Sequence, residues 1–458
     1  MTDLVVTGAA TIIPGWDAAP LSDGWLAVSN GLVEAIGRGA PPSAVRVLDA
    51  AGGLVLPGSV AAHHHLFQGS SRGVSVEGDL ITWLAVHYRA WAGLTEADVE
   101  AAATLSLAHL ALGGATTVAA FEYIHPADSD FVTPVLRAAD RVGLRIVYVR
   151  GCAPRLEGAL AERLGRENVP LERLVEPEDV ALRRTAEVVA RPATDRIHWA
   201  CGPTTPVVDD GGDFHRELAR IAASHGVPMH THFHPIPGTT ADGETAVELA
   251  RRTGLLARGN WFAHGSRLTS ADVSALGAAG VGLVHAPSCS VLLGYPIPPL
   301  GTWRRANDAL AITVDGAASN DRGSMLLEGQ LAWQLGRAVH GAAAALSPRG
   351  ILELMTVGPA RVLGWSGLGR LTVGAPADLA VVDLRALELA GAPDAGGDPV
   401  DRLFRTYAGG RVRHLLAGDR IVVEDGRLTG VDERAVAMAA TASANRLYGD
   451  TLQGRSAR

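Results

Sequence analysis

The chain has 458 residues, with 40 Lys and Arg against 48 Asp and Glu, and every one of its cationic residues is an arginine. The absence of lysine excludes Schiff-base chemistry, a P-loop lysine on phosphate and a carboxylated lysine that bridges two metal ions. The net charge of −8 at pH 7, with arginines scattered along the chain, argues against a nucleic-acid partner.

The cysteines and the amino terminus bear on where the protein works. Cys152, Cys201 and Cys289 are odd in number and widely spaced, which favours free thiols in a reducing compartment over a disulfide framework. The first residues, MTDLVVTGAATIIPGW, lack the basic and apolar regions of a secretion signal. The chain also lacks an apolar run of about eighteen residues. We therefore expect a cytoplasmic protein with no membrane partner.

Both ends of the chain have the sequence pattern of short β-strands. Residues 1–56 and 370–430 alternate short β-prone runs with Gly, Asn and Asp turns. We expect these two segments to pair into one small composite β-sandwich. Residues 431–458 are expected to form a C-terminal helical tail.

Residues 57–369 alternate strand-like runs with helical stretches, several of which end in glycine as helices often do. The strand-like runs cover residues 59–65, 115–121, 145–150, 196–200, 227–234, 260–264, 281–285 and 311–315. Eight β/α units predict an α/β fold, a distorted (β/α)8 barrel, with its chemistry at the carboxyl ends of the strands.

Histidines cluster on two of these strands. Side chains alternate between the faces of a strand, so His63 and His65 point the same way and His64 points opposite. In MHTHFHP on the fifth strand, the same period places three histidines on one face, namely His230, His232 and His234. Buried imidazoles without partners cost a few kcal/mol each. A metal, a substrate or both would satisfy them.

Two further strands end in a single polar residue. His264 ends the sixth strand and Asp315 the eighth, although His264 could be a satisfied core histidine and Asp315 a helix N-cap. Three neutral imidazoles and a carboxylate suit one divalent metal, Zn²⁺ or alternatively Fe²⁺. Such a metal lowers the pKa of bound water towards about 7, which makes hydroxide available.

Together these motifs resemble those of the amidohydrolase superfamily, in the cytosine-deaminase-like branch that contains 8-oxoguanine deaminase, guanine deaminase and the triazine hydrolases. The resemblance spans nearly the whole chain. It rests on the order and spacing of LPGSVAAHHHLFQ, GGATTV, GPTTP, MHTH, WFAHG, VHAPSCS, VDGAASND, GPARVLG and LGRLTVGAPADLAVVDL.

Carried over residue by residue, the resemblance implies a mononuclear site and a substrate contact. His264 would touch the metal-bound water or the substrate, and Gln68 would recognise the substrate. Asn320 and Asp321 would act as structural caps. The implied metal ligands are His63, His65, His232 and Asp315.

The chain departs from this family pattern at one position. Deaminases of the branch usually carry a glutamate three residues after the strand-five histidine, and Pro235 stands there. Proton transfer must then use another group, for which His234, Glu122 and Asp315 are the candidates. Two further residues are predicted to contact a planar substrate, His230 and Trp303, although core packing could also explain the tryptophan.

The sequence therefore predicts a metal-dependent hydrolytic deaminase. Metal hydroxide would attack a ring carbon of an aminated purine, pterin, pyrimidine or triazine and release ammonia. The alternative is a hydrolase of the same fold that displaces another leaving group, such as halide, or opens a cyclic amide. The expected partner is a small heterocyclic substrate. The sequence leaves open whether the protein forms a homo-oligomer.

Overall fold

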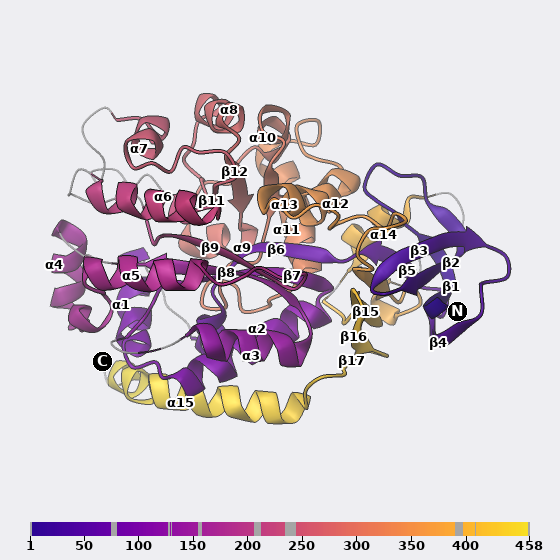
Figure 1. Cartoon of the computed structure of the whole chain (residues 1–458), viewed down its shortest axis with the longest axis horizontal. Helices are drawn as coiled ribbons and strands as arrows, with labels where there is room; N and C mark the ends of the chain where they lie inside the picture. Colours follow the sequence, from indigo (N-terminus) through magenta and orange to yellow (C-terminus); the bar gives the residue numbers. More distant parts are fainter. Residues whose placement is uncertain are drawn as a thin grey trace.

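The chain folds into a barrel of parallel strands wrapped by helices, beside a β-sheet built from both ends of the sequence (Figure 1). The structure is a computed structural model. It describes residues 2–74, 80–126, 129, 131–153, 158–205, 212–233, 244–389, 397–407 and 409–456. The predicted α/β class, with a barrel and a terminal β-rich unit, is confirmed.

The β-rich unit is one continuous sheet to which both termini contribute. Within the described residues it has nine strands, in the order β17-β16-β15-β14-β5-β1-β2-β3, with β4 paired to β1. N-terminal β5 runs antiparallel to C-terminal β14, from the pair Leu54 and Val382 to the pair Pro57 and Leu379. The strands are β1 Thr2–Ile12, β2 Leu21–Ser29, β3 Leu32–Arg38, β4 Ala44–Asp49, β5 Leu54–Pro57, β14 Leu379–Val382, β15 His414–Ala417, β16 Arg420–Glu424 and β17 Arg427–Leu428.

The barrel strands form two parallel half-sheets, each of four strands in the described part of the chain. The first half-sheet contains β6 Ser59–His64, β7 Ala115–Glu122, β8 Arg145–Cys152 and β9 Ile197–Pro203. The second contains β10 His230–Phe233, β11 Trp261–His264, β12 Gly282–His285 and β13 Leu310–Ile312. These eight strands lie at the eight predicted positions.

Two seams join the half-sheets. At one seam, Cys201 of β9 and Met229 form an isolated parallel bridge. At the other seam the Thr313 hydroxyl donates to the His63 carbonyl at 2.7 Å and accepts from the His63 N–H at 3.3 Å. A side-chain hydroxyl thus links the two half-sheets at this seam.

Helices cover the outside of the barrel (Figure 1). Their bounds are α1 Leu80–Trp91, α2 Glu96–Leu112, α3 Val132–Val142, α4 Gly158–Arg166, α5 Glu178–Val189, α6 Asp213–His225, α7 Ala246–Arg252, α8 Ser270–Ala279, α9 Pro287–Leu293, α10 Leu300–Ala306, α11 Met325–His340, α12 Pro348–Met355, α13 Val357–Val362, α14 Pro399–Thr406 and α15 Glu433–Ser456, with short 3-10 turns η1 Leu66–Ser71, η2 Leu171–Arg173 and η3 Leu387–Leu389. Among the described helices, none combines the length and apolar composition that crossing a bilayer requires.

Helix α15 is fastened to the outside of the barrel by polar contacts. The Ser443 hydroxyl donates to the Asp98 carboxylate at 2.8 Å, and Arg446 pairs with the same carboxylate. That carboxylate also accepts the Thr95 N–H at 3.0 Å and closes the capping box of α2. One side chain therefore starts a barrel helix and holds the last helix of the chain.

Replacing Asp98 with Ala should remove the cap and the anchor together. Loss of a cap costs about 1 kcal/mol, and loss of charged hydrogen bonds costs about 1.5–3 kcal/mol when they are shielded from water. Because Arg446 is half exposed, we expect a total loss of about 2–3 kcal/mol in the free energy of unfolding, measured by denaturant titration.

The matched control is Asp272→Ala. Asp272 closes the same Thr-x-x-Asp box with Thr269 at the exposed start of α8, so its loss should cost about 1 kcal/mol. Equal losses in the two variants would show that the contacts of Asp98 with α15 contribute nothing.

Candidate metal centre

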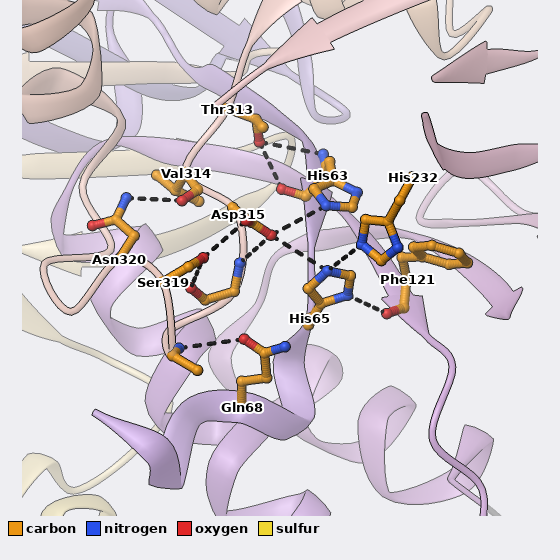
Figure 2. A network of polar contacts seen from close by, with 12 residues as sticks. His63, His65, Gln68, Phe121, His232, Thr313, Val314, Asp315, Ser319 and Asn320 are labelled. Carbon is orange, nitrogen blue, oxygen red and sulfur yellow. Dashed lines mark hydrogen bonds and ion pairs between the residues drawn. The ribbon is translucent and has the colours of Figure 1, made fainter. Parts of the chain in front are cut away.

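Figure 2 shows His63, His65 and Asp315 facing one another across the seam between β6 and β13. The Asp315 Oδ1 lies 3.1 Å from His63 Nε2 and 3.3 Å from His65 Nε2. His63 and His65 share a face because they are two residues apart, and their ring centroids are 4.6 Å apart. The first half-sheet and the segment after β13 thus supply three polar atoms to one point.

The second half-sheet adds a fourth atom. His232 of β10 places its Nε2 3.0 Å from His65 Nε2. The structure therefore brings together the four residues predicted to bind metal, with three imidazole nitrogens and one carboxylate oxygen converging (Figure 2).

The backbone carbonyls around the site determine which nitrogen of each ring carries the proton. His65 Nδ1 lies 2.6 Å from the Phe121 carbonyl, and His232 Nδ1 lies 2.8 Å from the Thr204 carbonyl. Since a carbonyl only accepts, each neutral ring must hold its proton on Nδ1. The Nε2 atoms of both rings then present lone pairs to each other at 3.0 Å.

His230 passes the influence of a third carbonyl to His63 and so determines which nitrogen of His63 carries the proton. His230 Nδ1 lies 2.9 Å from the Trp261 carbonyl and so carries the proton, which leaves Nε2 as an acceptor. His63 Nδ1 lies 2.7 Å from that Nε2 and must donate to it. The lone pair of His63 Nε2 is thereby directed at Asp315. Both nitrogens of His230 have protein partners, so its contacts do not support the predicted role in substrate binding.

Burial favours the neutral form of His63, His230 and His232. It lowers the pKa of His63 and His232 well below the usual value, and it lowers the pKa of His230 to about 3. Protonating one ring is therefore a costly way to relieve the contact between three lone pairs and a carboxylate. A divalent cation relieves it directly, since neutral imidazole and carboxylate are zinc and iron ligands. The residues present fit one such ion.

His264 and Asp315 both have a left-handed backbone, with φ of 72° and 62°. Such strain persists at functional sites where the surroundings hold it. Around Asp315, the Gly316 N–H donates to Oδ1 at 2.7 Å and the Ser319 hydroxyl to Oδ2 at 2.8 Å. The Asn320 amide donates to the Val314 carbonyl at 2.8 Å and so supports the loop that carries Asp315, while its expected capping role stays a prediction.

The ring of His264 lies against the cluster. It stacks on His232 with ring centroids 5.5 Å apart and planes inclined by 17°, and its centroid is 5.4 Å from that of His63. Burial lowers the pKa of His264 to about 3. The predicted catalytic histidine is thus adjacent to the candidate ligands and neutral.

Gln68 closes the side of the site below Asp315 (Figure 2). Its Oε1 accepts the Ala318 N–H at 3.3 Å. A Cβ at Gly316 would lie 2.0 Å from this oxygen, so a side chain there would displace the Gln68 amide. The amide is buried and fixed beside the cluster, where it could meet a ligand.

Phe121 and Tyr123 are site residues that the sequence analysis missed. The Phe121 ring centroid lies 4.8 Å from that of His230, and the Tyr123 centroid lies 4.9 Å from that of His65. The sequence indicates their position, because the two aromatics flank Glu122 at the end of β7 and therefore share one face of the strand.

That alternation directs Glu122 away from the histidines, contrary to its predicted role as proton shuttle. Its buried carboxylate accepts the N–H groups of Leu66 at 2.8 Å and Phe67 at 3.3 Å. It therefore caps the start of η1, directly after His65. Burial raises the pKa of Glu122 to about 7.

Of the remaining positions singled out in the sequence, Trp303 is described by the structure, and His234 and Pro235 are not. Trp303 of α10 is 1% exposed and lies in the hydrophobic core beside Gly265, so its burial favours packing over substrate stacking. His234 and Pro235 lie outside the described residues. The part played by His234 therefore stays a prediction.

Comparison with known proteins identifies the family. A model of the amidohydrolase family matches residues 54–421. An 8-oxoguanine deaminase from Pseudomonas aeruginosa is 32% identical over 452 residues, which cover 94% of this chain and 96% of that protein. A 5-methylthioadenosine/S-adenosylhomocysteine deaminase from Halobacterium salinarum is 32% identical over 455 residues, with 97% and 98% covered.

A solved structure agrees with these relatives. The crystal structure of an adenosine deaminase from Xanthomonas campestris with bound zinc has a TM-score of 0.85 at 26% identity, covering 98% of this chain and 99% of that one. The chain belongs to the amidohydrolase family, in its deaminase branch. It is an enzyme of the aminohydrolase type.

Replacing His230 with Phe should weaken metal binding. The variant keeps a ring stacked on Trp261 but removes the acceptor that holds the proton of His63 on Nδ1. Loss of such an orienting partner typically raises the metal dissociation constant about 10–100-fold. Competition with a chromophoric chelator measures that constant.

His198→Phe is the control, because His198 stacks on Trp365 at 3.6 Å in a contact outside the cluster. It should leave metal affinity unchanged. An unchanged affinity in His230→Phe as well would refute this role of His230.

Replacing Glu122 with Gln should change how stability depends on pH. The pKa of about 7 in the folded protein lies above the ordinary glutamate value of 4.5, so the native state binds this proton more tightly than the unfolded state. The wild-type free energy of unfolding should then fall as pH rises from 4.5 through 7, by about 3 kcal/mol from this group alone.

The glutamine keeps an acceptor for Leu66 and carries no charge. We expect the free energy of unfolding of the variant to rise relative to that of the wild type between pH 5 and pH 8, measured by denaturant titration. Parallel curves for the two proteins would contradict the raised pKa.

Proposed function

We propose that the protein is a metal-dependent hydrolytic deaminase that acts on an aminated N-heterocycle and releases ammonia. One observation carries the proposal. Three imidazole nitrogens and the Asp315 carboxylate converge on one point at the carboxyl ends of the barrel strands, an arrangement that suits a divalent cation. The assigned ligands are His63, His65, His232 and Asp315.

A divalent ion held by these four residues would lower the pKa of its water towards about 7 and so would make hydroxide available at neutral pH. The chain contributes the proton transfers. Asp315 has one oxygen among the imidazoles and the other 2.8 Å from the Ser319 hydroxyl, so its carboxylate can take a proton from water and return it. His264 remains neutral and orients the reacting groups by hydrogen bonding.

The leaving group needs a proton to depart as ammonia. Glu122 is committed to the amides of η1, and Pro235 replaces the usual glutamate, so Asp315 is the described residue best placed to deliver it. The names of the two relatives support an amino group on a purine ring as the target. Gln68, buried beside Asp315, is the proposed contact to the ring edge.

The missing glutamate also supports a second candidate. A leaving group that departs without a proton, such as halide, needs no general acid. The same site would then hydrolyse a halogenated heterocycle, or open a cyclic amide.

Elemental analysis of the purified protein should find about one Zn or Fe per chain, as one tetrahedral site requires. Removing that metal with a chelator should abolish turnover, and adding it back should restore it. Protein that is active without metal would refute the proposed chemistry.

Asp315→Asn, compared with wild type at equal metal occupancy, should lower kcat about 10²–10⁴-fold, the usual worth of a general acid and base. Screening aminated and halogenated purines, pterins, pyrimidines and triazines for ammonia and halide separates the two candidates. Halide release without ammonia from any amine would favour the second.

A further inference from the structure

Helix α15, at the end of the described chain, reaches the turn that carries Gln68. The helix packs against α1, α2 and η1, and its far end lies beside α1 (Figure 1). Tyr448 of this helix is 2% exposed, and its hydroxyl donates to the Ser71 hydroxyl at 2.8 Å. Ser71 is the last residue of η1, which begins directly after His65 and contains Gln68. A side chain from the end of the chain therefore holds the turn on which the proposed substrate contact lies.

A second helix also holds Ser71. The Trp91 Nε1–H donates to the same hydroxyl oxygen at 3.0 Å. His87 Nδ1 lies 2.7 Å from the Tyr448 hydroxyl, and because the proton of that hydroxyl is directed to Ser71, the imidazole donates. All four side chains are buried. Since a buried polar group that loses its partner is costly, these contacts keep the end of η1 in one position.

The aromatic face of α1 connects these contacts to the other side of Gln68. The ring centroid of His87 lies 4.6 Å from that of Trp83 and 5.2 Å from that of Trp91. The Trp83 Nε1–H donates to the Ala318 carbonyl at 3.1 Å, and the Ala318 N–H is the group that donates to Gln68 Oε1. One circuit of contacts thus leaves η1 at its last residue, passes through α15 and α1, and returns to the Gln68 carboxamide.

We propose that Tyr448 is a positioning residue for substrate recognition, which acts by fixing the end of η1 and hence the carboxamide of Gln68. The inference rests on the proposed function, in which Gln68 contacts the ring edge of an aminated heterocycle. The start of η1 is held separately by the Glu122 carboxylate, which accepts two of its N–H groups. Loss of the Tyr448 hydroxyl should therefore loosen the end of η1, while His65, before its start, keeps its place.

Tyr448→Phe removes one oxygen and keeps the ring. Loss of this buried hydrogen bond should raise KM about 5–10-fold, with kcat changed less than about twofold and metal content equal to that of the wild type. Adenosine and guanine, as aminated purines, serve as substrates, and released ammonia is measured. Ser71→Ala should raise KM by a similar factor. The double variant should raise it no further, because the two side chains act through one contact.

Ser443→Ala is the matched control. Its hydroxyl also donates at 2.8 Å from a buried position on α15, but the acceptor is Asp98 at the start of α2 and not η1. The control should lower stability as Tyr448→Phe does and leave KM unchanged. An equal rise of KM in both variants, or no rise in Tyr448→Phe, would overturn the positioning role.

Amide hydrogen exchange of the full chain tests the hold on η1 without any substrate. The amides of residues 66–71 should exchange about 5–10-fold faster in Tyr448→Phe than in the wild type or in Ser443→Ala, because they open more often. Unchanged exchange would overturn the inference. If neither purine releases ammonia while exchange still rises, the proposed function fails and the hold of Tyr448 on η1 stands.

Discussion

The site depends on where three protons lie. The carbonyls of Phe121 and Thr204 hold the Nδ1 protons of His65 and His232, and the Trp261 carbonyl acts on His63 through His230. Every nitrogen that faces the centre is consequently an acceptor. With neutral rings the cluster is not a self-satisfied polar network, and burial opposes protonation of His63 and His232.

The surrounding loops maintain this geometry. Glu122 holds the start of η1 directly after His65, and Ser319 and Gly316 hold the carboxylate of Asp315. Glycine at position 316 leaves room for the Gln68 amide, which a side chain there would displace. Supports of this kind stabilise the left-handed backbone at Asp315, which would otherwise cost on the order of 1–3 kcal/mol.

Much of this arrangement could be predicted from the sequence, because strand alternation and the carboxyl-end rule together determine which side chains share a face and an edge. His63, His65, His232 and Asp315 are brought together as expected, although metal binding by them stays a prediction. The confirmed barrel has a physical basis in short apolar runs that alternate with helical stretches.

The misplaced residues show what such patterns omit. Alternation gives the face of His230 but not its depth, and two residues further down the strand it meets His63 and Trp261 instead of the open end of the barrel. The side chain of Glu122 points away from the histidines because its two neighbours, Phe121 and Tyr123, point towards them. These flanking aromatics could have predicted that direction from the sequence. Burial of Trp303 depends on packing between helices, which spacing along one segment does not encode.

The divided barrel has a consequence for the protein in the cell. His63 lies in one half-sheet with His65 directly after it, His232 lies in the other, and Asp315 follows the last strand. A bound ion would therefore link both halves where they meet. Metal binding and closure of the barrel then share one free energy. A shortage of metal would not merely slow such an enzyme but would expose its seams to proteases, so the supply of metal would determine how much of the protein survives.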